Sequence, residues 1–154
     1  MLTAGPQGFA LHEAPQNVPN IRFVTEDGRK KTLVDFRGKV ILLNIWATWC
    51  PPCVEEMPTL DALQAELGGP GFEVVALSID RAGPDVVRKF LDRIGIENLE
   101  LYVDETRLSF TAVRAVGLPA TLLIDAEGRE LGRLIGPADW DDPEMVSFLR
   151  GYLA

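Results

Sequence analysis

Two long apolar runs dominate the hydrophobic pattern of the chain. Residues 40–46 (VILLNIW) carry no charge, and residues 72–79 (FEVVALSI) carry one. Such runs are typical of strands that are buried on both faces of a sheet, usually parallel strands near its centre. Between them, residues 50–67 place apolar side chains at helical spacing and end at the helix-stopping segment 68–71 (GGPG). The pattern therefore predicts a strand–helix–strand unit at the centre of the fold.

The remaining positions predict short strands that alternate with helices. In chain order we expect a hairpin from residue 21 with its turn at 27–28, a helix from 84, a strand over 99–103, a helix over 109–115, a hairpin of strands 120–125 and 129–135, and a terminal helix from 143. This order predicts an α/β fold, with a mixed central sheet that helices cover on both faces. Residues 1–17 contain prolines and no periodicity, so we expect an N-terminal arm on the surface there and a single domain over residues 18–154.

The composition fits one globular domain and argues against two classes of partner. Of the 154 residues, 47% are hydrophobic and 25% are charged, as in ordinary soluble domains. The net charge is −8, from 15 basic and 23 acidic residues, and the only basic cluster is residues 29–31 at the predicted hairpin turn. An acidic surface without a basic block is a poor match for nucleic acid or an anionic membrane. No apolar run reaches the ~18 residues of a membrane span.

Both cysteines of the chain lie in one motif, Trp49-Cys50-Pro51-Pro52-Cys53. Positions three apart on a helix share one face, and this spacing brings the two Cα atoms near the ~5.5 Å that is typical of a disulfide. The two prolines suit the first turn of a helix, because N–H groups have no intrahelical partner there. Cys50 then lies at the positive end of the helix dipole, which stabilises a thiolate. The motif predicts a pair that switches between dithiol and disulfide.

Metal binding is the alternative use for these sulfurs. Zinc needs four ligands, or three and a water, and the chain adds only one histidine, His12, which we expect at the surface. A copper(I) carrier would use both sulfurs as soft ligands together with a further one, for which Met57 is close in sequence. The isolated pair with its helical spacing favours redox chemistry over either metal.

Residues 40–58 (VILLNIWATWCPPCVEEMP) resemble the TlpA/ResA-like thiol–disulfide oxidoreductases of the thioredoxin superfamily. Further segments fall in the same order, namely residues 36–39 (FRGK), 75–80 (VALSID) and 117–119 (GLP). The resemblance extends over about residues 18–153 and implies a thioredoxin fold with an N-terminal hairpin extension. Asn44 stands where thioredoxin itself has a buried aspartate, which favours the TlpA-like branch.

The resemblance also implies a role for each residue of the site. Cys50 is expected to be the exposed attacking thiol and Cys53 the buried resolving thiol. Pro119 is expected to follow a cis peptide bond beside the disulfide, with Leu118 presenting its backbone to an extended substrate segment. The complete substrate-binding set that we predict is Trp49, Pro51, Pro52, Leu118 and Pro119.

Glu56 is the predicted proton acceptor of the site. It lies three residues after Cys53, so the two side chains can share one helix face. A carboxylate there raises the pKa of a buried thiol by charge repulsion and can accept its proton. Among the tryptophans outside the motif, we expect Trp46 in the core and Trp140, which lies among aspartates, on the surface.

These residues predict a thiol–disulfide oxidoreductase that needs no small-molecule cofactor and no metal. Its partners would be a disulfide-bearing substrate protein and an upstream dithiol protein that donates electrons, and we expect a monomer. The resemblance implies a reductant of the kind that serves cytochrome c maturation or copper-site assembly. A thiol peroxidase is the enzymatic alternative, but Leu43 and Ala47 occupy the positions where peroxiredoxins carry a proline and a threonine.

The compartment is open to two interpretations. The resemblance implies a periplasmic or extracytoplasmic protein tethered through its N-terminus, with residues 1–17 as the remnant of a linker to a removed anchor. The first ten residues are uncharged and hold no long apolar run, so they are not a signal peptide as written. The alternative is a cytoplasmic protein.

Overall fold

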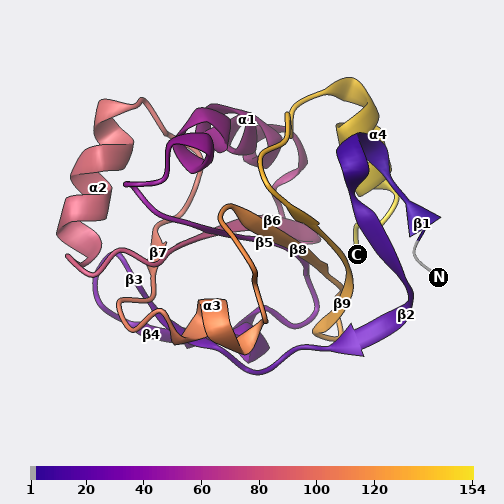
Figure 1. Cartoon of the computed structure of the whole chain (residues 1–154), viewed down its shortest axis with the longest axis horizontal. Helices are drawn as coiled ribbons and strands as arrows, with labels where there is room; N and C mark the ends of the chain where they lie inside the picture. Colours follow the sequence, from indigo (N-terminus) through magenta and orange to yellow (C-terminus); the bar gives the residue numbers. More distant parts are fainter. Residues whose placement is uncertain (1–2) are drawn as a thin grey trace.

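A mixed sheet of nine strands forms the centre of the computed structural model, which describes residues 3–154 (Figure 1). The strands are β1 (Thr3–Ala4), β2 (Ala10–Asn17), β3 (Arg22–Thr25), β4 (Lys30–Thr32), β5 (Val40–Trp46), β6 (Phe72–Ser78), β7 (Tyr102–Val103), β8 (Ala120–Ile124) and β9 (Arg129–Ile135). Their order across the sheet is β1-β2-β9-β8-β5-β6-β7-β3-β4. The helices are α1 (Pro51–Leu67), α2 (Pro84–Arg93), α3 (Leu108–Ala112) and α4 (Pro143–Arg150), with short 3-10 helices η1 (Pro6–Gly8) and η2 (Leu33–Phe36).

Strand β5 lies in the middle of this sheet, as its apolar sequence predicts. All seven of its residues are buried, and it pairs with β6 in parallel and with β8 in antiparallel orientation. Helices α1 and α2 connect the parallel strands β5, β6 and β7 and lie on the same face, whereas α3 lies on the opposite face (Figure 1). Two right-handed crossovers that step in one direction across a sheet place both helices on one face. The C-terminal end of β5 therefore delivers the chain directly to the start of α1.

Helix α1 begins and ends where the sequence predicts. Cys50 is its N-cap residue, and Pro51 occupies the first helical position, where a missing N–H costs nothing. The helix stops at Gly68, the first residue of the glycine-rich segment. Its buried residues are Cys53, Glu56, Met57, Leu60, Asp61, Leu63 and Leu67. This buried face holds α1 against the sheet and fixes the position of the cysteine pair.

The surface arm that we expected at the N-terminus is instead part of the sheet over the described residues. Strand β2 pairs antiparallel with β9, and β1 pairs with β2. Phe9 is fully buried, and its ring packs against Trp140 and Phe148. Pro15 lies where the register between β2 and β9 shifts, a position at which a strand tolerates proline. No residue of β2 is fully buried and buried positions do not alternate with exposed ones along it, which is why the hydrophobic pattern did not reveal it.

His12 is also less exposed than we expected. Its side chain is 12% exposed, and its Nε2 lies 2.6 Å from Oε2 of the buried Glu130 on β9. Arg133, on the same strand, donates to both oxygens of Glu130 at 2.7 Å. These charge partners hold the pKa of Glu130 below its usual value against the opposing effect of burial. The cluster ties the N-terminal segment to the rest of the domain.

The remaining elements agree with the sequence except in length. The strand expected over residues 99–103 is confined to β7, because only Tyr102 and Val103 pair with the neighbouring strands. The helix expected over residues 109–115 begins one residue earlier and ends at Ala112. Within residues 3–154, no helix combines the length and the apolar character needed to cross a bilayer.

Candidate active site

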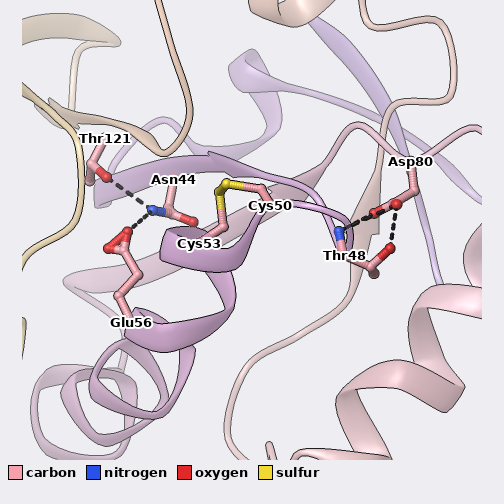
Figure 2. Close-up of a disulfide and its surroundings, with 7 residues drawn as sticks. All are labelled: Asn44, Thr48, Cys50, Cys53, Glu56, Asp80 and Thr121. Carbon is pink, nitrogen blue, oxygen red and sulfur yellow. Dashed lines mark hydrogen bonds between the residues drawn. A yellow bond between two sulfur atoms is a disulfide. The ribbon is translucent and has the colours of Figure 1, made fainter.

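The two cysteines form a disulfide at the start of α1, as their spacing predicts. Their Cα atoms are 5.3 Å apart. Cys53 is fully buried, and Cys50 is 6% exposed, so in the disulfide state Cys50 is less accessible than we expected. Figure 2 shows the bridge lying across the first turn of α1. Only Cys50 reaches the surface, through the groove described next.

A groove of about 630 Å³ opens beside Cys50. Its lining residues are Trp49, Cys50, Pro51, Ile79, Arg107, Phe110, Thr111, Gly117 and Leu118. Of the predicted substrate-binding residues, Trp49, Pro51 and Leu118 lie in this groove, and Trp49 is 56% exposed. Pro52 and Pro119 do not line it. The peptide bond between Leu118 and Pro119 is cis, as the resemblance to TlpA/ResA-like proteins implies.

Glu56 lies in a buried polar network behind the disulfide. Its Oε1 accepts a hydrogen bond from Asn44 Nδ2 at 3.3 Å, and Asn44 Nδ2 also donates to Thr121 Oγ1 at 2.9 Å. Asn44 and Thr121 face each other because β5 and β8 pair at these two residues. Figure 2 shows Asn44 between the disulfide and Glu56, with its Oδ1 on the side of Cys53. That oxygen is buried and has no hydrogen-bond partner among the described residues.

Trp140 completes the network, which corrects our expectation that it lies on the surface. Its side chain is fully buried, and its Nε1 donates to Oε2 of Glu56 at 2.7 Å. Its backbone N–H donates to Thr59 Oγ1 at 3.2 Å. The aspartates around Trp140 suggested solvent, but the segment before α4 turns the ring inward onto α1. Both oxygens of Glu56 therefore have a fixed donor.

Burial raises the pKa of Glu56 to about 7, from 4.5 for a solvated glutamate. Only 2% of the residue is exposed, so water cannot solvate its charged form. The hydrogen bonds from Trp140 and Asn44 favour the charged form and offset part of this effect. A carboxyl group with a pKa near neutrality can both accept and release a proton at physiological pH. That Glu56 accepts the proton of Cys53 stays a prediction.

A second carboxylate positions the loop before Cys50. Asp80 follows β6 and is 5% exposed. It accepts hydrogen bonds from the backbone N–H of Thr48 at 3.0 Å and from Thr48 Oγ1 at 2.6 Å (Figure 2). Ser78 Oγ donates to the same carboxylate at 2.6 Å. Asp80 therefore holds the loop that carries Trp49 and Cys50 against the end of the neighbouring strand.

Replacing Asp80 by asparagine is expected to lower the free energy of unfolding by about 1–3 kcal/mol. An amide has one acceptor oxygen, so its NH₂ group would face donors that now bind a carboxylate oxygen. Urea unfolding of the Asp80→Asn variant measures the loss. Asp141→Asn, the same change at an exposed aspartate, is the matched control. Equal unfolding midpoints for the two variants would show that the Asp80 contacts contribute nothing.

No group of three or more histidine, cysteine, aspartate or glutamate side chains within residues 3–154 is arranged to hold a metal ion. Met57, named above as a candidate soft ligand, is fully buried in the core.

Three parts of the site were not identified from the sequence. They are the contact of Trp140 with Glu56, the contact of Asp80 with Thr48, and the groove residues Arg107, Phe110 and Thr111. Of these residues, only Asp80 could have been noticed in the sequence. It follows the apolar run 72–79, and α/β sheets place functional residues at the carboxyl ends of their strands. The other residues carry no local pattern that separates them from ordinary surface positions.

Comparison with known proteins agrees with this geometry. Residues 13–149 match the Redoxin family. The thiol-disulfide oxidoreductase ResA of Bacillus thuringiensis (strain Al Hakam) is 29% identical over 99% of this chain and 90% of that protein. The ResA protein of Geobacillus kaustophilus is 33% identical over 79% of this chain and 70% of that protein. A crystal structure of a thioredoxin-family thiol:disulfide interchange protein from Chlorobium tepidum superposes with a TM-score of 0.67 at 27% identity, covering 89% of this chain and 97% of that one.

Proposed function

The chain belongs to the Redoxin family, and we propose that its Cys50–Cys53 pair reduces disulfide bonds in partner proteins. The disulfide-forming pair and the relatives establish that the chain is a thioredoxin-like thiol–disulfide oxidoreductase. Such a protein acts on protein substrates and exchanges electrons with redox partners. One observation carries the proposal. Cys50 borders an open groove at the N-terminus of α1, while Cys53 is fully buried.

The reaction is thiol–disulfide exchange in two steps. The thiolate of Cys50 attacks one sulfur of the partner disulfide, so a bond forms between Cys50 and that sulfur and the other partner sulfur leaves as a thiolate. Cys53 then loses its proton and attacks the sulfur of Cys50. This forms the Cys50–Cys53 disulfide and releases the second partner thiolate. The pair has given two electrons to the partner, and an upstream dithiol protein must return two before the next cycle.

Glu56 and Asn44 support the second step. Cys53 is buried and must be deprotonated before it can attack. We assign the uptake of that proton to Glu56, because burial raises its pKa to about 7. The unpartnered Oδ1 of Asn44 gives the reduced Cys53 thiol an acceptor until the proton leaves. Trp140 fixes the carboxyl group in position through its 2.7 Å hydrogen bond.

The Pro-Pro pair favours reduction over oxidation of the partner. Pro51 and Pro52 provide no N–H groups in the first turn of α1, and the Val54 N–H already binds the Cys50 carbonyl at 3.1 Å. Fewer free donors near Cys50 stabilise its thiolate less, and a less stable dithiol form is a stronger reductant. From the resemblance of residues 40–58 to TlpA/ResA-like proteins we also propose an extracytoplasmic location and a task in cytochrome c maturation, with copper-site assembly as the alternative.

The reduction potential is the experiment that tests this direction. The protein is equilibrated with mixtures of reduced and oxidised dithiothreitol, and the fraction of Cys50–Cys53 disulfide is counted by alkylation and mass spectrometry. We expect a potential near that of thioredoxin, about −270 mV, and well below the about −120 mV of a strong oxidant. A value near the oxidant end would contradict the reducing direction. A disulfide that dithiothreitol cannot open would contradict the exchange chemistry altogether.

A further inference from the structure

We propose that Arg107 makes the groove selective for disulfide proteins that carry a carboxylate side chain beside the cysteine under attack. This inference rests on the proposed function, because it concerns which substrates the same groove accepts. The occupant that fits is an extended substrate segment with an apolar side chain and an acidic side chain next to its cysteine.

The first support is the placement of the guanidinium group. Arg107 lines the groove together with Cys50 and Leu118. Its Cζ lies 5.4 Å from the centre of the Trp49 ring, and its Nε donates to the backbone oxygen of Ile79 at 3.0 Å. These two contacts fix the plane of the guanidinium in the groove that Cys50 also lines. The terminal nitrogen atoms remain available for a bidentate contact with a carboxylate.

The second support is the backbone of Arg107. The residue has φ 63° and ψ 6°, in the left-handed region that a residue with a side chain seldom adopts. Residues in sparsely populated backbone regions persist where the surrounding structure holds them, and they are frequent at ligand clamps. Here the N–H of Arg107 donates to the Asp104 carbonyl at 3.3 Å, and its own carbonyl accepts from Phe110 at 3.2 Å. The strained turn directs this side chain into the groove.

The third support is the charge of the groove. Arg107 is half-buried and forms no ion pair with a carboxylate among residues 3–154. It is also the one charged residue among those that line the groove. The arginines that do form ion pairs are Arg29, Arg88, Arg129, Arg133 and Arg150. An unpaired cation in the groove that Cys50 lines, in a chain with a net charge of −8, has a carboxylate as its complementary ligand.

The test uses three symmetric disulfide peptides that differ at one position next to cysteine, which is glutamate, glutamine or lysine. Reduced protein is mixed with each peptide at low salt, and its oxidation is followed by tryptophan fluorescence. A charge beside cysteine also alters the intrinsic reactivity of the peptide. Each rate is therefore divided by the rate at which 2-mercaptoethanol reduces the same peptide.

We expect the corrected rate for the glutamate peptide to exceed that for the glutamine peptide by about 1.5- to 5-fold, the range of a solvent-accessible ion pair, with the lysine peptide slowest. Arg107→Glu should reverse the order of the glutamate and lysine peptides, and Arg107→Gln should make the three rates equal. Arg114→Glu is the matched control. Arg114 is exposed, flanks the other end of α3 with φ 58°, and does not line the groove. It should keep the wild-type order.

Three results would overturn the inference or its premise. Equal corrected rates in the wild type would overturn selectivity by Arg107 and leave the reductase proposal standing. Equal changes in Arg107→Glu and Arg114→Glu would show that net charge, not the groove, sets the order. Failure of the wild type to reduce any of the three peptides would overturn the proposed function itself.

Discussion

Cys53→Ser is expected to abolish turnover and to leave partner proteins covalently attached to Cys50. Cys50 borders the groove and can still attack a partner disulfide, whereas the serine at position 53 cannot complete the second step. The mixed disulfide then has no internal nucleophile within reach and accumulates. Non-reducing electrophoresis after incubation with a disulfide-bearing protein should show a band at the summed mass, which disappears when dithiothreitol is added.

The reciprocal variant is the control. Cys50→Ser removes the sulfur that borders the groove and keeps the fully buried Cys53, so it should neither turn over nor trap a partner. Equal trapping by the two variants would contradict the assignment of attacking and resolving roles. Trapping by Cys50→Ser alone would reverse these roles and would mean that the groove beside Cys50 is not the docking site.

The parts of the fold that could be predicted are those in which local pattern and tertiary structure agree. The buried strand β5, the prolines at the start of α1 and the glycines after it are local signals, and each gave the correct element. The disulfide followed from two cysteines three residues apart. Both cysteines lie within one turn of the same helix, so the motif alone determines how far apart they are.

The contacts that the sequence did not reveal join distant parts of the chain. Trp140 lies 84 residues from Glu56, and Asp80 lies 32 residues from Thr48. The neighbours of Trp140 in sequence are aspartates, which indicate solvent, yet its ring is fully buried. The segment between β9 and α4 carries Trp140 back to α1. Phe9, which immediately precedes the unpredicted strand β2, packs against its ring. Long-range packing overrides local composition at such places.

The buried network around Glu56 leads to the second prediction, which concerns how the free energy of unfolding depends on pH. Its pKa is about 7 in the folded protein and near 4.5 when solvated, so the folded state binds more protons than the unfolded state between these values. The free energy of unfolding must therefore fall as pH rises through this window. The loss due to Glu56 is about 3 kcal/mol and is complete above pH 7. Below pH 4.5 the group is protonated in both states and contributes no slope.

Glu56→Gln should remove this contribution, because an amide does not titrate. Urea unfolding at several pH values between 4.5 and 8 should show that the variant loses less stability than the wild type as pH rises. At the acidic end the variant should be the less stable protein. A glutamine has a single acceptor oxygen, so its NH₂ group faces either the Trp140 or the Asn44 donor. Glu55→Gln, the same change at the exposed neighbour, should keep the wild-type slope.

The same variant separates a structural from a chemical role for Glu56. If the carboxyl group takes up the proton of Cys53, Glu56→Gln should also change the thiol titration of the reduced protein and slow the release of the mixed disulfide. Alkylation rates of the reduced protein as a function of pH measure the titration, and quenched-flow trapping measures the release. If Glu56→Gln alters the pH dependence of stability but neither the thiol titration nor the release of the mixed disulfide, Glu56 has a structural role only. If Glu56 does take up the proton of Cys53, the stability slope and the thiol chemistry should both change in this one variant, because the same buried carboxyl group causes both.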